Sequence, residues 1–189
     1  MAGTGPKVLI IRNTNQTQLD ARIKTLGKLA AFVGVPAASR EARSTQLQAM
    51  AAKTNSKKKK AYLTKAAEED VTNAELMFIH TYGSKVNHIP ARPVLQPATM
   101  AEDNKKRIAN ELAASIRATL EGEPEVAEQK MLRAALAGQN AARKWFTDPR
   151  NGWKANAPAT IARKGSDRPL IDTGALRASI VGIIDKDAK

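Results

Sequence analysis

The segment Leu170–Ala175, "LIDTGA", contains the most chemically suggestive carboxylate of the sequence. Asp-Thr-Gly after two aliphatic residues is the pattern with which an aspartic protease presents its catalytic aspartate. That reaction needs two such aspartates about 3 Å apart that share one proton, held by two lobes or two subunits. Because the sequence before Asp172 is mostly helical in pattern, we reject the protease and expect Asp172 or Thr173 to cap a short helical turn over residues 173–178.

No other combination of residues predicts a catalytic or metal site. His80 and His88 are the only histidines, and no carboxylates stand around them at ligand spacing. The N-terminal "GTGPK" lacks the length and the Ser or Thr of a phosphate-binding loop, and no Ser-His-Asp arrangement is indicated. The absence of cysteine excludes disulfides and thiolate metal sites. We expect no catalytic residue, no cofactor and no metal.

The net charge of +13 favours polyanionic partners, which include nucleic acid, acidic protein surfaces and anionic membranes. The charge is densest in a basic segment over residues 39–70, where Lys57, Lys58, Lys59 and Lys60 are consecutive. Like charges at this density resist burial, so we expect a mobile loop or a solvated helical insertion. The four lysines could contact DNA phosphates or an acidic neighbour. No apolar run approaches the length of a membrane span, so we expect no membrane partner.

The composition predicts a modest core. Of the 189 residues, 34 are alanine and seven are aromatic, so much of the apolar content is helix-forming rather than bulky. We expect elements whose stability depends partly on neighbours, including other subunits.

The order of the predicted elements indicates one α+β domain over residues 1–189. Strands are expected at residues 5–13, 29–37 and 179–185, so that a small sheet forms from N- and C-terminal strands. The long helices should form a hairpin, one starting at a Thr99–Glu102 capping box and stopping at Gly122, the next opening at Pro124 and ending near Phe146. Residues 17–28 should form a helix that stops at Gly27, and residues 73–84 a strand or a short helix ending at Gly83.

A proline-rich strap is predicted over residues 85–98. Prolines at 90, 93 and 97 disfavour a helix and fix φ near −65°, so the segment should run extended. A rigid, partly apolar segment that contains an arginine is suited to lie along another surface.

Two segments carry a distinctive motif. Phe78–Ala98, "FIHTYGSKVNHIPARPVLQPA", has a Tyr-Gly pair followed by Ile-Pro-Ala-Arg-Pro, and Gly152–Ile180 contains Pro-Leu-Ile-Asp-Thr-Gly-x-Leu-Arg-x-Ser-Ile. In this order, with a long helical region between them, they resemble the tail-completion and neck proteins of long-tailed bacteriophages, also described as virion morphogenesis or minor tail proteins. The sequence departs from that family at Val94, where a bulky aromatic is usual, and at Thr81, where an acid is common.

The resemblance implies a non-enzymatic structural part of the head–tail connector, a homo-oligomeric neck or tail-completion ring around the DNA channel. Implied partners are other neck proteins, the portal or adaptor, and the tail terminator or tube, with nonspecific contact to genomic DNA. The implied location is the virion, after assembly in the host cytoplasm. The alternative is a basic nucleic-acid-binding protein or an assembly chaperone that acts outside the virion. The residues expected at subunit or neighbour interfaces are Tyr82, Ile89, Pro90, Arg92, Pro93, Val94, Leu95, Trp153, Arg168, Leu170 and Arg177.

Overall fold

The computed structural model describes residues 16–37, 40–69 and 71–188. This part of the chain is mostly helical with one two-stranded antiparallel sheet, which confirms the predicted α+β class. The strand predicted over residues 5–13 lies outside the described residues. The elements are α1 Gln16–Leu26, β1 Ala30–Gly34, α2 Arg40–Ala52, α3 Lys57–Ala67, α4 Asn73–Tyr82, α5 Leu95–Met100, α6 Glu102–Glu121, α7 Pro124–Trp145, the 3₁₀ turn η1 Pro149–Asn151, α8 Pro158–Lys164, α9 Ala175–Ala178 and β2 Val181–Asp185.

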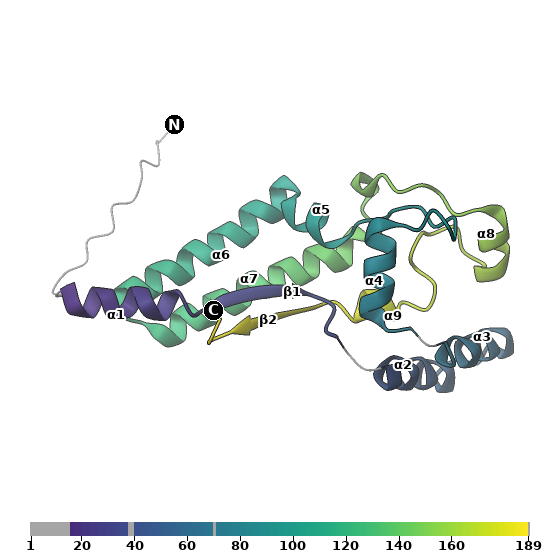
Figure 1. Ribbon diagram of the computed structural model, residues 1–189, viewed down its shortest axis with the longest axis horizontal. Coiled ribbons are helices and arrows are strands. Elements are labelled where there is room, and N and C mark those ends of the chain that lie inside the picture. Colours follow the sequence, from purple (N-terminus) through teal and green to yellow (C-terminus); the bar gives the residue numbers. More distant parts are fainter. Residues whose placement is uncertain (1–15, 38–39, 70, 189) are drawn as a thin grey trace.

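The two longest helices, α6 and α7, form the predicted hairpin and lie side by side along the molecule (Figure 1). Gly122 ends α6 in the left-handed region at φ 84°, and Pro124 opens α7, where a missing N–H leaves no intrahelical bond unmade. Small residues line the contact, and the Ser115 hydroxyl donates to the carbonyl of Ala127 at 2.7 Å. The hairpin therefore follows from signals in the sequence.

The predicted capping box at Thr99 is wrong. Thr99 lies inside α5, where its hydroxyl donates to the carbonyl of Leu95 at 2.9 Å, and α6 has no side-chain cap. A capping box starts α4 instead: the Thr72 hydroxyl accepts from the backbone N–H of Glu75 at 3.1 Å, and the Glu75 carboxylate accepts from that of Thr72 at 2.7 Å. Residues 73–82 are therefore a helix rather than a strand.

The sheet is a ribbon of β1 and β2 that lies along α7 (Figure 1). Glycines make this close approach possible. A Cβ added to Gly182 would stand 2.3 Å from the carbonyl oxygen of Ala135, and one added to Gly138 would stand 2.7 Å from Val33. Gln139 of α7 also accepts a hydrogen bond from the Gly182 N–H at 2.8 Å. One face of the ribbon is thereby covered by α7.

The basic segment is a hairpin of α2 and α3, here called the arm, which projects at the lower right of Figure 1. Leu47 and Leu63 are almost fully buried and pack with alanines of both helices and with Ala175 of α9. Arg43 donates to the carbonyl of Ala66 at 2.9 Å. Of the two alternatives that the sequence left open, the helical insertion is therefore the correct one.

The main core gathers where α4, α7, α9 and the strap meet. It contains Met77, Val94, Trp145, Phe146 and Ile180, all buried. Among the described residues, eleven of the twenty buried hydrophobic residues are alanine, which confirms the thin core expected from composition.

Candidate functional site

The strap folds back on α4 before it runs extended. Gly83 ends α4 with φ 74°, and Ser84 and Ile89 then pair through two backbone hydrogen bonds of 2.8 Å across a tight turn. A Cβ on Gly83 would stand 2.7 Å from the carbonyl oxygen of Ile89. Glycine is therefore required for this return.

The prediction that residues 85–98 run extended is correct only for the middle of this segment. Residues 85–88 form the turn, 90–94 run extended, and α5 begins at Leu95. Pro97 is the third residue of α5, where the backbone N–H has no acceptor inside the helix, so proline is tolerated. The prediction failed because it treated proline as incompatible with every helical position.

Arg92 lies at the base of the strap with only 7% of its surface exposed. Its Nη2 donates to the carbonyls of Lys154 at 2.8 Å and Ala155 at 3.3 Å, and its Nε donates to that of Lys154 at 3.2 Å. No carboxylate of the described residues forms an ion pair with it, and burial lowers the pKa of the guanidinium. Arg92 thus carries an unneutralised charge into the interior.

Val94 and Trp153 also belong to the interior of this chain. Val94 is fully buried, and the indole Nε1 of Trp153 donates to the carbonyl of Pro93 at 3.1 Å while its ring meets Phe146 edge-on at 5.9 Å. The prediction that Arg92 and Val94 face a neighbouring subunit is therefore wrong, because both are already occupied within the monomer.

The remaining predicted interface residues differ in exposure. Tyr82 is 71% exposed and lies against Phe78, with ring centroids 4.8 Å apart. Arg177 is exposed and donates to the carbonyl of Arg143 at 2.8 Å. Arg168 is exposed, and those that are half-buried are Ile89, Pro90, Pro93, Leu95, Trp153 and Leu170.

A large cleft opens between α4, the strap and the segment that leads into α8. We call it the basic cleft; its volume is about 1210 Å³. Its charged lining consists of Lys85, Arg92, Lys154 and Arg163, and no aspartate or glutamate lines it. No local motif connects Lys85, Lys154 and Arg163, which come from distant parts of the chain, so the sequence alone gives no signal for this group.

The positive charges of this region affect one another. Burial, then Arg92 and Lys164, lower the pKa of His80, so its imidazole is neutral at pH 7. Burial also lowers the pKa of Lys164; the nearby Asp172 opposes this, while Arg92 and Arg163 add to it. Neighbouring cations therefore act on His80, while at Lys164 the charge of Asp172 opposes that of the arginines.

Asp172 has a hydrogen-bonding partner on the arm. Its carboxylate accepts a hydrogen bond from the phenol of Tyr62, on α3 of the arm. The hydroxyl of Thr173 accepts from the N–H of Ala175, the first residue of α9, at 3.1 Å. The prediction that Asp172 or Thr173 caps this helical turn is wrong, because the N-cap of α9 is Gly174 and no side chain caps the helix. Asp172 instead connects the arm to the segment before α9.

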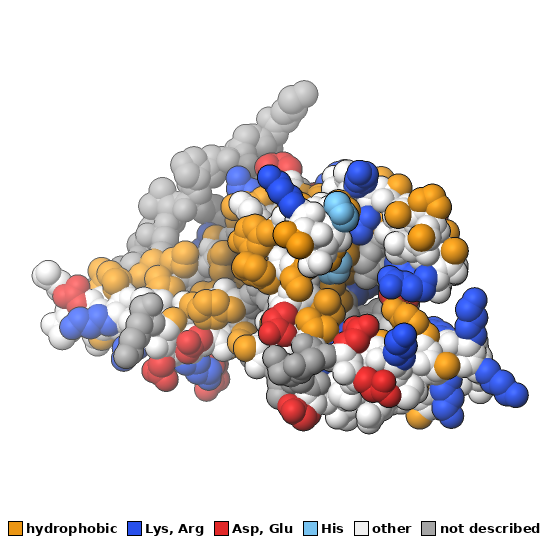
Figure 2. All heavy atoms as spheres, turned by 45° about the vertical axis from the view of Figure 1, so that its right-hand side comes forward, with side chains coloured by type: hydrophobic (Ala, Val, Ile, Leu, Met, Phe, Trp, Pro, Cys, Tyr) orange, Lys and Arg blue, Asp and Glu red, His pale blue; other side chains and the backbone are white. Residues whose placement is uncertain are grey.

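The four lysines of the basic segment, Lys57–Lys60, form the first turn of α3, and all four are exposed. Blue side chains project from this part of the molecule at the lower right of Figure 2. They stand at the positive end of the helix dipole, which disfavours cations. Their position therefore weakens α3 slightly while it leaves their charges available to an anionic partner.

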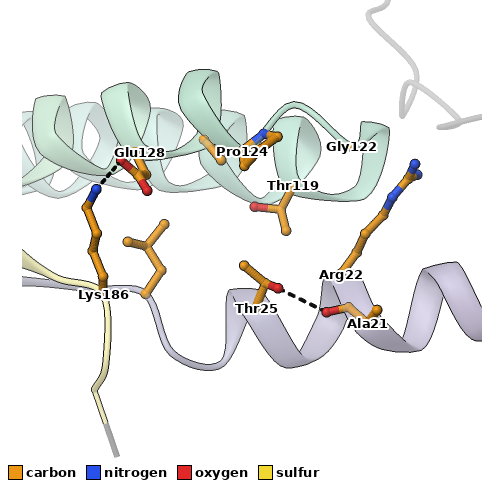
Figure 3. Close-up of a pocket in the computed structure, with 10 residues that line it drawn as sticks. Ala21, Arg22, Thr25, Thr119, Gly122, Pro124, Glu128 and Lys186 are labelled. Atoms are coloured by element: carbon orange, nitrogen blue, oxygen red, sulfur yellow. Dashed lines mark hydrogen bonds and ion pairs between the residues drawn. The ribbon is translucent and has the colours of Figure 1, made fainter.

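A smaller, mainly apolar pocket of about 320 Å³ lies between α1 and the start of α7 (Figure 3). An ion pair of 2.6 Å between Lys186 and Glu128 lies at one end, and Arg22, which donates to the carbonyl of Leu120 at 2.7 Å, lies beside Gly122 at the other. Its few polar groups bond within the chain, so this pocket shows no arrangement for catalysis.

Across residues 16–37, 40–69 and 71–188, no three His, Cys, Asp or Glu side chains come together as a metal site. Within the same ranges, no helix combines the length and apolar character that crossing a bilayer requires. Comparisons of the chain with protein-family models, with curated proteins and with solved structures each returned no match.

Proposed function

We propose that the protein is a structural subunit of a bacteriophage head–tail connector, a neck or tail-completion ring that joins the portal side of the capsid to the tail around the DNA channel. The observation that carries this proposal is the distribution of large apolar side chains. Nine are buried in the described part of the chain and eleven are exposed. Exposed large side chains in clusters are typical of surfaces that partners cover.

These exposed side chains are grouped. Phe32 and Ile183 lie opposite each other on the ribbon, the rings of Phe78 and Tyr82 contact each other on α4 at a tilted angle, and Leu132 and Leu136 are one turn apart on α7. A ring subunit contacts its two neighbours through different patches, so several separate apolar surfaces suit a head-to-tail assembly.

The resemblance to phage neck proteins supports the same proposal, but with the motif residues inside the subunit rather than at its interfaces. The two motif segments meet in space, since Arg92 bonds to Lys154 and Ala155, and Trp153 bonds to Pro93. The shared motif then serves the fold of the subunit, and the interfaces are formed by the exposed groups around it.

The test is assembly of particles from separated parts. Filled heads and free tails from a phage that lacks this protein should join when the purified protein is added, and electron microscopy should place it at the junction. Light scattering of the protein, alone and mixed with portal or tail tube, should show rings only with a template. Normal joining of heads and tails without the protein would refute the proposal.

One observation favours the second candidate, a free nucleic-acid-binding protein: Lys57–Lys60 are fully available on the projecting arm. Such a protein should bind DNA tightly at low salt, with an affinity that falls steeply with ionic strength. A ring subunit should bind DNA weakly and without sequence preference.

A further inference from the structure

The basic cleft contains cations that form no ion pair with the described residues. The side chains of Lys85, Lys154 and Arg163 make no hydrogen bond or ion pair with described residues, and Arg92 bonds only to backbone carbonyls. The adjoining cavity is lined by two acidic residues, Glu69 and Asp172. Glu69 pairs with Arg43, and Asp172 accepts a hydrogen bond from Tyr62, so neither forms an ion pair with a cation of the cleft. Low-dielectric walls strengthen the field of charges inside a concavity, so an anion that enters the cleft could pair with Lys85, Lys154 and Arg163, while the buried Arg92 adds only its field.

Exposed apolar side chains lie on the cleft lining and next to it in the chain. Tyr82 lines the cleft and is 71% exposed, and Phe78, which packs against Tyr82, is 64% exposed. Val86, between the lining residues Lys85 and Asn87, is 88% exposed. Figure 2 shows hydrophobic side chains gathered over α4 beside the histidines. A ligand matched to this site must therefore carry both negative charge and apolar groups.

Volume and shape select the class of ligand. At about 1210 Å³ the cleft exceeds the range of about 300 to 1,000 Å³ that is usual for small-molecule sites. A DNA duplex is a convex rod, which fits the projecting first turn of α3 with Lys57–Lys60 better than it fits a concave surface. Bases of single-stranded nucleic acid stack on aromatic side chains, which an aliphatic residue such as Val86 cannot replace. Val86 can instead pack against an apolar side chain of a protein.

We propose that the basic cleft binds an extended acidic segment, interspersed with apolar residues, of an adjoining protein. The segment's carboxylates would pair with Lys85, Lys154 and Arg163, and its apolar side chains would pack on Tyr82 and Val86. The identity of that protein as a neighbouring connector layer rests on the proposed function; the binding property does not.

The probe is a fluorescein-labelled 12-residue peptide of glutamates with three leucines, measured by anisotropy at low salt against the full-length protein. The matched variants are Lys85→Glu with Arg163→Glu in the cleft, and Lys58→Glu with Lys59→Glu on the arm. Both change the net charge equally, and all four positions are exposed. We expect the cleft variant to bind the peptide at least about tenfold more weakly and the arm variant to change affinity less than about threefold.

Three results would overturn the proposal. An equal loss in the arm variant would mean general attraction to a basic protein. Equal binding of a peptide with glutamine in place of glutamate would remove the role of charge. Tighter, cleft-dependent binding of a 12-nucleotide single strand would assign the cleft to nucleic acid. Circular dichroism checks the fold, and if the double variant does not fold, Tyr82→Ser should weaken binding at least about threefold.

The peptide assay separates this inference from the proposed function. If the peptide binds through the cleft while phage lacking the protein still join heads and tails, the cleft stands and the connector role is refuted. Absence of peptide binding, together with an assembly defect in such phage, refutes the cleft and leaves the connector role intact.

Discussion

Phe32 of β1 lies directly opposite Ile183 of β2, and the two side chains are 50% and 53% exposed. Because side chains alternate along a strand, this pair points away from α7, which Val33 and Gly182 face. The ribbon therefore has one face covered by its own helix and one apolar face on the surface. A partner that covers this face would bury both side chains.

The first prediction concerns this pair. Replacing Phe32→Ser and Ile183→Thr together should raise the concentration at which subunits associate by at least about tenfold, because the buried apolar area at the contact is lost. Light scattering over a range of concentrations, with portal or tube present, measures this. Met100→Ser, which also replaces an exposed apolar side chain but lies at the end of α5, should leave self-association unchanged. The ribbon face is no interface if the double variant assembles like the parent.

The second prediction concerns Arg92. Arg92→Ala should lower the free energy of unfolding by about 2–3 kcal/mol, since three hydrogen bonds from a charged, buried group are lost. Arg92→Lys should recover only part, because an ammonium cannot reproduce the guanidinium fork. Urea unfolding measures both. The exposed Arg177, which also bonds to a carbonyl, is the control, and Arg177→Ala should cost less than about 1 kcal/mol. Equal effects at the two sites would contradict the structural role of Arg92.

The third prediction compares two glycines of the ribbon. Gly182→Ala places a methyl group 2.3 Å from the backbone oxygen of Ala135, so the ribbon must move off α7, at a cost of about 2 kcal/mol or more. Gly34→Ala, in the partner strand, meets nothing within 4 Å and should be neutral or slightly stabilising. Thermal unfolding of both variants measures the difference, and similar melting temperatures would mean that the ribbon does not pack as described.

The fourth prediction is a pH dependence from Tyr62. Burial, then the hydrogen bond to Asp172 and its charge, raise the pKa of Tyr62 to about 12 from 10. The folded state therefore holds the phenolic proton more tightly than the unfolded state. The resulting stabilisation is complete below pH 10 and is lost as the pH rises through 12. Absorbance at 295 nm should show a phenol ionising near 12 that is missing in Tyr62→Phe. If the parent protein and Tyr62→Phe show the same absorbance titration near pH 12, the contact between Tyr62 and Asp172 does not form in solution.

The fifth prediction concerns the lysines of the arm. Replacing Lys57–Lys60 by glutamine should leave the fold intact and raise stability by a few tenths of a kcal/mol, because cations at a helix N-terminus oppose its dipole. If these lysines contact DNA, the salt dependence of binding should become shallower by up to about 0.9 per lost phosphate contact. Gel-shift titrations at several salt concentrations measure the slope. An unchanged slope would show that the arm does not contact DNA.

The sequence by itself determined those helices and strands that have strong local start and stop signals. Gly122 and Pro124 specify where one long helix ends and the next begins, Gly27 follows the end of α1, and the short apolar runs around residues 30–34 and 181–185 form the strands. These signals act between residues within one or two turns of each other, so no other part of the chain is needed to interpret them.

The tertiary structure alone decided which residues face inward and what the candidate site is. The local sequence around Arg92 and Val94 predicts an exposed strap. In the fold, Arg92 instead bonds to the carbonyls of Lys154 and Ala155, and Val94 packs in the main core. The basic cleft exists only because Lys85, Lys154 and Arg163 converge from separate segments. This convergence depends on packing between residues far apart in the sequence, so no local sequence pattern predicts it.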